Sequence, residues 1–158
     1  MRFLCLVLFL LCAPLYAQSV TDIAPRDGWA THPTNQDFAT LVSNLRAAVS
    51  DHGMAVVTRA GPTGAAANRG VTIPGNQVIG VFNNTYAVRI LRHSTHAMIH
   101  APIRFYVTEN TDGTATLSYI LPSALLSPYF DDADPDLQAA AEELDAIFDA
   151  IAQDAAAR

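Results

Sequence analysis

The sequence predicts an α+β fold: a two-layer sandwich in which a mostly antiparallel sheet of four to five strands carries helices on one face. Short alternating apolar segments are interleaved with segments of helical periodicity, in the order β-α-β-β-α-β-β-α. Two alternating segments, residues 103–109 and 114–120, are joined by a loop that contains glycine, which predicts a hairpin. The chain of 158 residues is 51% hydrophobic and 15% charged, which suits one domain with its own core.

The first elements follow from local patterns near the start of the domain. Residues 28–32 resemble a short strand, and the apolar residues of 38–49 recur at helical spacing. Thr34 is the expected N-cap of this helix, with Asp37 three residues later completing a variant of the capping box. Gly53 ends the helical pattern, because glycine readily takes the left-handed conformation after a helix.

The middle of the chain contains shorter elements. Residues 54–58 and 78–82 are apolar runs of strand length, and we expect the second to be an interior strand. The segment 61–64 has the glycine and proline of a turn and leads into one helical turn over residues 65–68. Residues 86–91 have helical spacing.

The last element is an acidic amphipathic helix over residues 135–154. Asp134 is its expected cap, with proline in the first helical position. The buried stripe includes Leu144 and Phe148. The strand before it is expected to end at Pro122.

The first residues predict export. A single arginine, an apolar run and a small residue before the cut are typical of a secretory signal peptide over residues 1–17. Cys5 and Cys12 both lie inside it, so the mature chain would have no thiol and no disulfide. Residues 18–27 are a flexible lead-in. We expect a periplasmic or extracellular protein with no membrane insertion after cleavage.

Charge is unevenly distributed along the single domain expected over residues 28–158. The formal net charge is −6, and nine acidic residues lie in the segment 131–158. This balance argues against a nucleic-acid partner. The expected partners of the acidic helix are arginines of the domain body, such as Arg46, Arg89 or Arg104, or another chain.

Four phrases, taken in order, resemble one family. Asp51–Val56 joins a helix end to an apolar strand through glycine, and Gln77–Asn84 is a strand that runs into asparagine. Ala101–Val107 places proline before a strand, and Asp112-Gly113 forms the hairpin loop. Together they resemble the domain of unknown function DUF302 over nearly the whole mature chain. The resemblance implies a compact α+β fold and a tendency to pair, and it implies no established activity.

Three histidines form one candidate site. On a continuous helix, His93, His96 and His100 would share a face, because they are three, four and seven residues apart. Such a face binds Zn, Cu or Ni, and Met98 would suit copper. The alternative is surface histidines beside a loop, since Ser94 and the threonine after it resemble a new N-cap.

A second candidate site lies where a strand meets a helix. Backbone N–H groups after Asn83 and Asn84 are placed to hold an anion, with Arg89 and Arg92 within two turns. The alternative is plain capping by asparagine. A hydrolase or isomerase with a pocket near Asn83 is a weaker hypothesis.

Aromatic residues form the remaining candidate set. They line a pocket or belong to the core. They are Trp29, Tyr86, Phe105, Tyr106 and Tyr119.

The chain has no nucleophile elbow and no glycine-rich phosphate loop. We therefore expect an exported, non-catalytic binding or interaction module that acts as a homodimer, with an unknown small ligand or protein partner. A periplasmic metal binder using the three histidines is the alternative.

Overall fold

The computed structural model describes residues 21–131 and 134–158. The predicted signal peptide and the first three residues of the lead-in lie outside these residues, so the signal stays a prediction. No helix of the described residues is long and apolar enough to cross a membrane.

A five-stranded antiparallel sheet forms one layer, which confirms the predicted α+β fold. Its spatial order is β1-β5-β4-β3-β2, so β5, β4 and β3 are interior strands. The hairpin of β4 and β5 is present, and each strand begins or ends within two residues of the segment expected from the sequence. The strands are β1 (Trp29–Pro33), β2 (Ala55–Ala60), β3 (Asn76–Phe82), β4 (Ile103–Glu109) and β5 (Ala115–Ile120).

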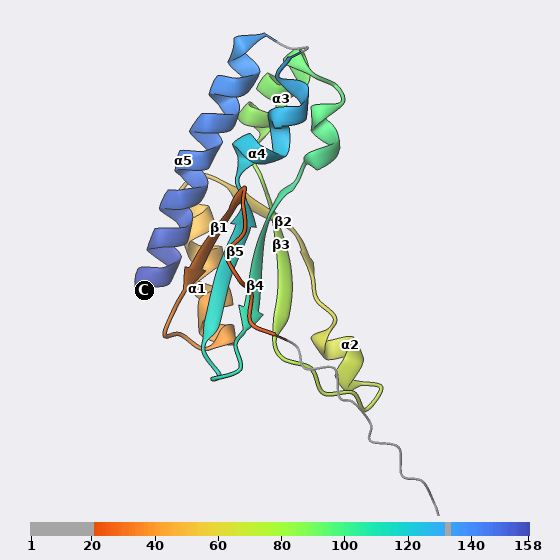
Figure 1. Cartoon of the computed structure of the whole chain (residues 1–158), viewed down its shortest axis with the longest axis vertical. Helices are drawn as coiled ribbons and strands as arrows, with labels where there is room; N and C mark the ends of the chain where they lie inside the picture. Colours follow the sequence, from red (N-terminus) through yellow and green to blue (C-terminus); the bar gives the residue numbers. More distant parts are fainter. Residues whose placement is uncertain (1–20, 132–133) are drawn as a thin grey trace, which may run out of the picture.

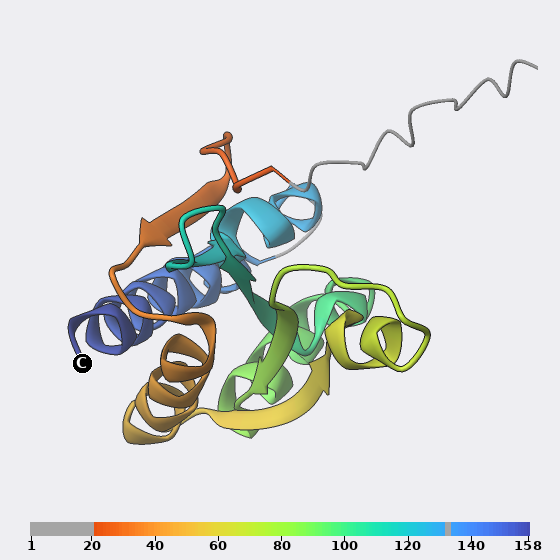
Figure 2. The same ribbon diagram turned by 90° about the horizontal axis from the view of Figure 1, so that it is seen from below.

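Two long helices form the second layer. Helices α1 (Phe38–Asp51) and α5 (Pro135–Ala157) lie together on one side of the strands (Figure 2). The short elements gather at the two ends of the sheet (Figure 1). One end carries α2 (Thr63–Ala67). The other end carries α3 (Asn84–His93), η1 (Ala97–His100), α4 (Pro122–Leu126) and η2 (Ser127–Tyr129).

The core fills the space between the helix layer and one face of the sheet. Alternate residues of the interior strands β3, β4 and β5 point into it, as the period of a strand requires. Its centre is a group of aromatic rings: Phe105 stacks on Phe148 with ring centroids 4.6 Å apart, and Tyr119 meets Phe105 edge-on at 5.2 Å. Phe148 therefore anchors α5 to the middle of the sheet.

The predicted cap of α1 is corrected by the structure. Asp37, not Thr34, is the N-cap, and its carboxylate accepts the backbone N–H of Thr40 at 2.9 Å. The Thr34 hydroxyl instead donates to the carbonyl of Ala115 across the sheet. Gly53 follows the helix with φ of 71°, the conformation for which glycine was expected there.

Several helix boundaries differ from the predictions, including that of α2, which begins at Thr63 rather than at residue 65. Helix α3 extends beyond the predicted 86–91 at both ends, because Asn83 caps it from the preceding turn. Pro122 ends β5 as expected, but it also begins α4, where proline at the first position is tolerated. Helix α5 continues to Ala157 through an alanine-rich end of high helix propensity.

The opposite face of the sheet carries neither of the two long helices, and its residues form rows across the strands. One row joins Thr31 to Ser118, Ser118 to Tyr106 and Tyr106 to Val78. The next row joins Thr116 to Thr108 and Thr108 to an asparagine of β3. Most residues of these two rows are small and polar, with Tyr106 and Val78 as the larger members.

Candidate functional site

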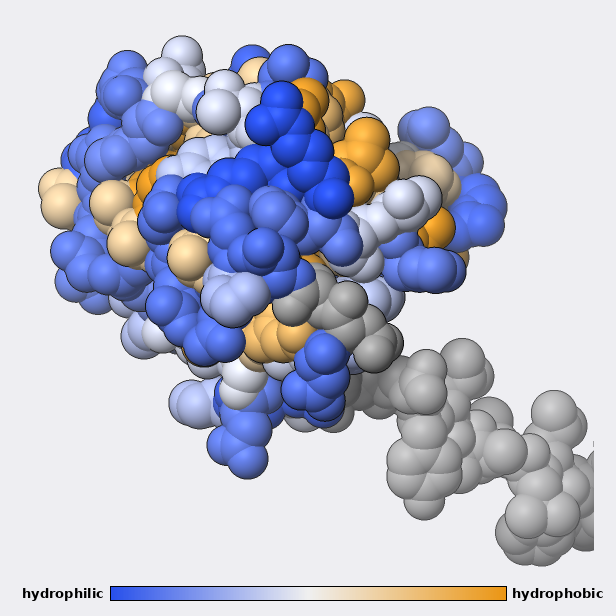
Figure 3. Space-filling model, turned by 90° about the horizontal axis from the view of Figure 1, so that it is seen from above, coloured by the Kyte–Doolittle hydropathy of each residue, from blue (hydrophilic) through white to orange (hydrophobic). Residues whose placement is uncertain are grey.

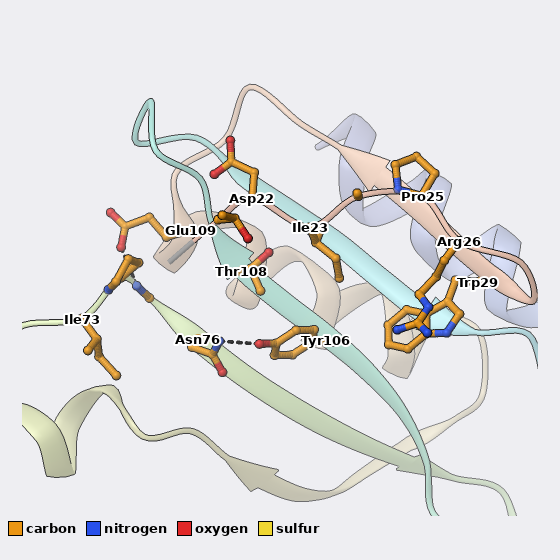
Figure 4. Close-up of a pocket in the computed structure, with 14 residues that line it drawn as sticks. Asp22, Ile23, Pro25, Arg26, Trp29, Ile73, Asn76, Tyr106, Thr108 and Glu109 are labelled. Atoms are coloured by element: carbon orange, nitrogen blue, oxygen red, sulfur yellow. Dashed lines mark hydrogen bonds between the residues drawn. The ribbon is translucent and has the colours of Figure 1, made fainter. Parts of the chain in front are cut away.

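A pocket of about 510 Å³ lies on this uncovered face of the sheet. We call it the sheet-face pocket. One wall is the N-terminal strap, residues 21–26, and the other is the loop before β3 (Figure 4). Ligand pockets commonly have volumes of roughly 300–1,000 Å³. Its principal lining residues are Asp22, Ile23, Pro25, Arg26, Trp29, Ile73, Asn76, Tyr106, Thr108 and Glu109.

The floor of the pocket is polar. The side-chain amide of Asn76 donates a hydrogen bond to the hydroxyl of Tyr106, which leaves the tyrosine proton available for another acceptor. The hydroxyl of Thr108 is buried and has no hydrogen-bond partner among the described residues. Buried polar groups are nearly always paired in folded proteins. The Thr108 hydroxyl is therefore an exception to this pattern, and it lies out of contact with solvent.

The strap has no regular secondary structure, yet it contacts the domain at both ends. The carboxylate of Asp22 accepts the backbone N–H and the hydroxyl of Thr111, in the hairpin loop, at 2.8 and 3.1 Å. The guanidinium of Arg26 lies over the ring of Trp29, 5.5 Å from its centroid. The strap is thus connected to two separate parts of the sheet, and the flexibility expected of the lead-in stays a prediction.

At the acidic end of the pocket, the carboxylate of Glu109 is hydrogen-bonded within the protein. Glu109 accepts the backbone N–H of Gly75 through its carboxylate. A Cβ atom at Gly75 would lie 2.5 Å from the ring of Phe38, so this loop approaches α1 too closely for a side chain. The backbone of the loop is therefore fixed between Glu109 and Phe38.

The other end is aromatic and basic. A neighbouring hollow of about 370 Å³ shares Trp29, Asn76 and Tyr106 with the sheet-face pocket and adds Arg104 of β4. Arg26 and Arg104 are both exposed, and neither forms an ion pair with the described residues. Each of two adjoining hollows that share Trp29 therefore contains one arginine, and the Asp22 and Glu109 carboxylates of this face are already hydrogen-bonded.

The predicted site at Asn83 is a helix cap. Its side chain accepts the backbone N–H groups of Thr85 and Tyr86 and donates to the carbonyl of Gly53. Asn84 is exposed in the first turn of α3. The capping alternative thus describes the contacts of Asn83, and anion binding there stays a prediction.

The space beside Asn83 is a cavity of about 30 Å³, close to the volume of one water molecule. Apolar side chains form most of its wall, among them Met54, Val81 and Leu144. This cavity offers little room for the substrate of a hydrolase or isomerase.

Arg89, also predicted to bind a ligand, connects α3 to α5 instead. Its guanidinium contacts the carboxylates of Asp136 and Glu143, each within 2.9 Å. Arg89 lowers the pKa of Asp136 from 3.8 to about 2, and it lowers the pKa of Glu143 as well. Of the arginines expected to pair with the acidic helix, Arg89 does so. Arg92 is exposed on α3.

The three histidines lie in different surroundings. His93 is 2.9 Å from the Asp136 carboxylate, and His100 is 3.0 Å from the Tyr129 hydroxyl. His96 is exposed, because α3 ends at His93 and the chain turns into η1. Among residues 21–131 and 134–158, no three His, Cys, Asp or Glu side chains converge as metal ligands. The structure does not supply the continuous helix on which the metal hypothesis depended, and Zn, Cu or Ni binding stays a prediction.

The end of the molecule that carries α3 and η1 has a largely hydrophilic surface, with smaller hydrophobic areas (Figure 3). The exposed apolar side chains of α3 and η1 are Val88, Leu91 and Ile99.

Both interpretations of the aromatic residues are correct, for different members. Phe105 and Tyr119 are buried in the core, whereas Trp29 and Tyr106 line the sheet-face pocket. Tyr86 donates to Glu143 on α5.

Sequence reasoning missed Arg26 of the strap and Thr108 of β4 as pocket residues. The signal for Thr108 was the polar half of the alternating strand 103–109. The strap had no periodic pattern that could reveal its contacts.

The fold and the pocket together define a class: a small two-layer α+β domain with a ligand-sized hollow on the uncovered face of its sheet. The family model for the domain of unknown function DUF302 matches residues 30–153. The chain belongs to the DUF302 family.

A solved structure has the same fold. The crystal structure of an uncharacterized conserved DUF302 protein from Bacillus stearothermophilus is similar with a TM-score of 0.73 and 17% sequence identity, over 82% of this chain and 99% of that one. No curated protein matches the chain. The family and the neighbour thus establish the fold and leave the activity open.

Proposed function

We propose that this protein is an exported binding module that holds a small ligand in the sheet-face pocket. The observation that carries the proposal is a pocket of about 510 Å³ whose floor carries the Tyr106 hydroxyl, which accepts from Asn76 and keeps its own proton to donate. The groups around it hydrogen-bond and stack, which are the interactions that orient a bound ligand. Export rests on the signal-peptide pattern, and assembly as a homodimer rests on the resemblance to the family.

The first experiment is native mass spectrometry of the untagged mature protein, purified from a periplasm without chelators. One spectrum reports the cleavage site, the number of chains and any retained ligand mass. We expect a chain that begins at Gln18, two copies, and an added small-molecule mass. A chain that retains residues 1–17 would contradict export, and a lone chain would contradict the homodimer.

Two matched variants connect ligand binding to the pocket. Ile73→Trp places an indole ring inside the pocket, whereas Val71→Trp places the same ring at a 50% exposed position of the same loop, outside the lining. A thermal-shift screen of small molecules should find compounds that stabilise the parent and Val71→Trp and leave Ile73→Trp unchanged. Compounds that stabilise all three equally, together with no retained mass, would exclude this pocket as the binding site.

A further inference from the structure

We propose that the sheet-face pocket is selective for an organic anion with a flat apolar body, such as an aromatic carboxylate. Its carboxylate would lie between Arg26 and Arg104, and its ring would lie along Trp29 and Tyr106. The inference rests on the proposed function, and it adds the class of ligand.

The charged groups around the pocket differ in whether they have partners. The carboxylate of Asp22 is engaged by Thr111, and the carboxylate of Glu109 accepts the N–H of Gly75. In contrast, neither Arg26 nor Arg104 has a carboxylate partner among the described residues. A guanidinium binds carboxylates with two parallel charge-assisted hydrogen bonds.

The two arginines come from different parts of the chain. Arg26 comes from the strap and lies over the Trp29 ring. Arg104 comes from β4, and together with Trp29 it lines the neighbouring hollow. Trp29 pairs with Ile120 of β5, and β5 pairs with β4, so Arg104 is two strands from Trp29. Two strand spacings are about 10 Å. Over this distance the Arg104 side chain and the Arg26 side chain at Trp29 can both reach one anionic group.

Hydrogen-bond donors and aromatic rings lie beside the two arginines. The Tyr106 hydroxyl accepts a hydrogen bond from Asn76 and keeps its own proton to donate. Donors on arginine and tyrosine favour a ligand rich in acceptors, and the adjoining rings favour an apolar body that can stack.

Charge is distributed unevenly between the two faces of the sheet. The chain as a whole is acidic, with a formal charge of −6. Much of that acidity lies on α5, which covers the opposite face of the sheet (Figure 2). Arg89 and Arg158 neutralise some of these acids, whereas the arginines at Trp29 remain available to an anion from solution.

The test measures the affinity of three probes by calorimetry: phenylacetate, its neutral amide phenylacetamide, and acetate. Trp29 is the single tryptophan of the chain, so its fluorescence gives a second, site-specific readout. We expect phenylacetate to bind at least about 10-fold more tightly than either other probe, since a hydrogen bond to a charged group contributes enough for such a ratio.

Variants connect that preference to the two arginines. Arg26→Gln and Arg104→Gln should each weaken phenylacetate binding about 10-fold and leave phenylacetamide binding unchanged. Arg46→Gln removes an exposed arginine of α1, which lines neither hollow, and should change neither. Unfolding midpoints equal to that of the parent would show that the exposed substitutions leave the fold intact.

Two results would overturn the inference. Phenylacetamide that binds as tightly as phenylacetate would show that charge is not recognised, and unchanged phenylacetate affinity in both glutamine variants would exclude the arginines. If no aromatic anion binds while Ile73→Trp still abolishes binding of another compound, the pocket is a binding site for a different class of ligand. If no compound distinguishes Ile73→Trp from Val71→Trp, the proposed function fails as well.

Discussion

Asp136 shows how one side chain connects two helices. It accepts from Arg89 and lies 2.9 Å from His93, both on α3, while it belongs to the first turn of α5. A carboxylate in this position also interacts favourably with the helix dipole. The residue therefore stabilises the folded chain through its ionised form.

The pH dependence of this contact can be predicted. The folded pKa of Asp136, about 2, is below its ordinary value of 3.8. The ionised carboxylate therefore stabilises the folded state above about pH 4, and this contribution is lost as the pH falls through about 2. Asp136→Asn should lower the urea midpoint at pH 7, and the difference from the parent should disappear near pH 2.

Asp27→Asn is the control, because Asp27 is exposed and forms no ion pair among the described residues. It should leave the midpoint unchanged at both pH values. A difference between Asp136→Asn and the parent that stays constant from pH 7 to pH 2 would contradict this role of the carboxylate.

Single caps and turns were mostly predictable from the sequence, because their chemistry is local. Gly53 and Asp134 have the expected roles. The exception is Thr34, which was predicted to cap α1 with Asp37 completing the capping box, whereas Asp37 is itself the cap. The Thr34 hydroxyl forms a tertiary hydrogen bond to the carbonyl of Ala115 on β5 instead.

At the scale of elements, α5 is held by its apolar stripe more than by its charges. Phe148 is fully buried against Phe105 and Tyr119. Replacing a buried phenylalanine by alanine typically costs about 3–5 kcal/mol, and a buried carboxylate adds a further penalty. That loss is a large part of the stability of a typical domain, about 5–15 kcal/mol.

Phe148→Asp should therefore unfold the protein or release α5, as measured by urea denaturation followed by circular dichroism. Glu142→Gln on the exposed side of the same helix should have little effect, because its contact is a surface hydrogen bond from Gln138. Equal midpoints for Phe148→Asp and the parent would mean that the helix layer is not part of the core.

The elements missed by sequence reasoning are short. Helix α4 and the turn η2 have five and three residues, too few for a periodic pattern. Their positions depend on burial of Pro122 and Leu126 in the folded chain. Long helices and alternating strands have enough turns or residues to show their buried side in the sequence.

At the scale of the whole molecule, the two faces of the sheet differ: one forms the core and the other forms the pocket. One face packs against α1 and α5 and contains the core. The other face carries the sheet-face pocket and the strap. We therefore expect changes on the pocket face to affect binding with little effect on stability.

Removing the strap tests this separation. A mature chain that begins at Asp27 should keep its circular dichroism spectrum and most of its urea midpoint, because the strap contributes no residue to the core. The emission of Trp29 should move to longer wavelength, since Arg26 no longer covers the ring. Loss of the folded spectrum would show instead that the strap is needed for folding.

The sequence by itself determined the fold class, the hairpin, the acidic last helix and the family. These features depend on periodicity, turn residues and caps, which involve residues close together in the chain. Only the tertiary structure decided where the candidate site is. It separated His93, His96 and His100, paired Arg89 with carboxylates of α5, and brought the strap beside Tyr106 and Trp29. A pocket is built from residues that are distant in the chain, and their meeting depends on strand order and register, which no local pattern specifies.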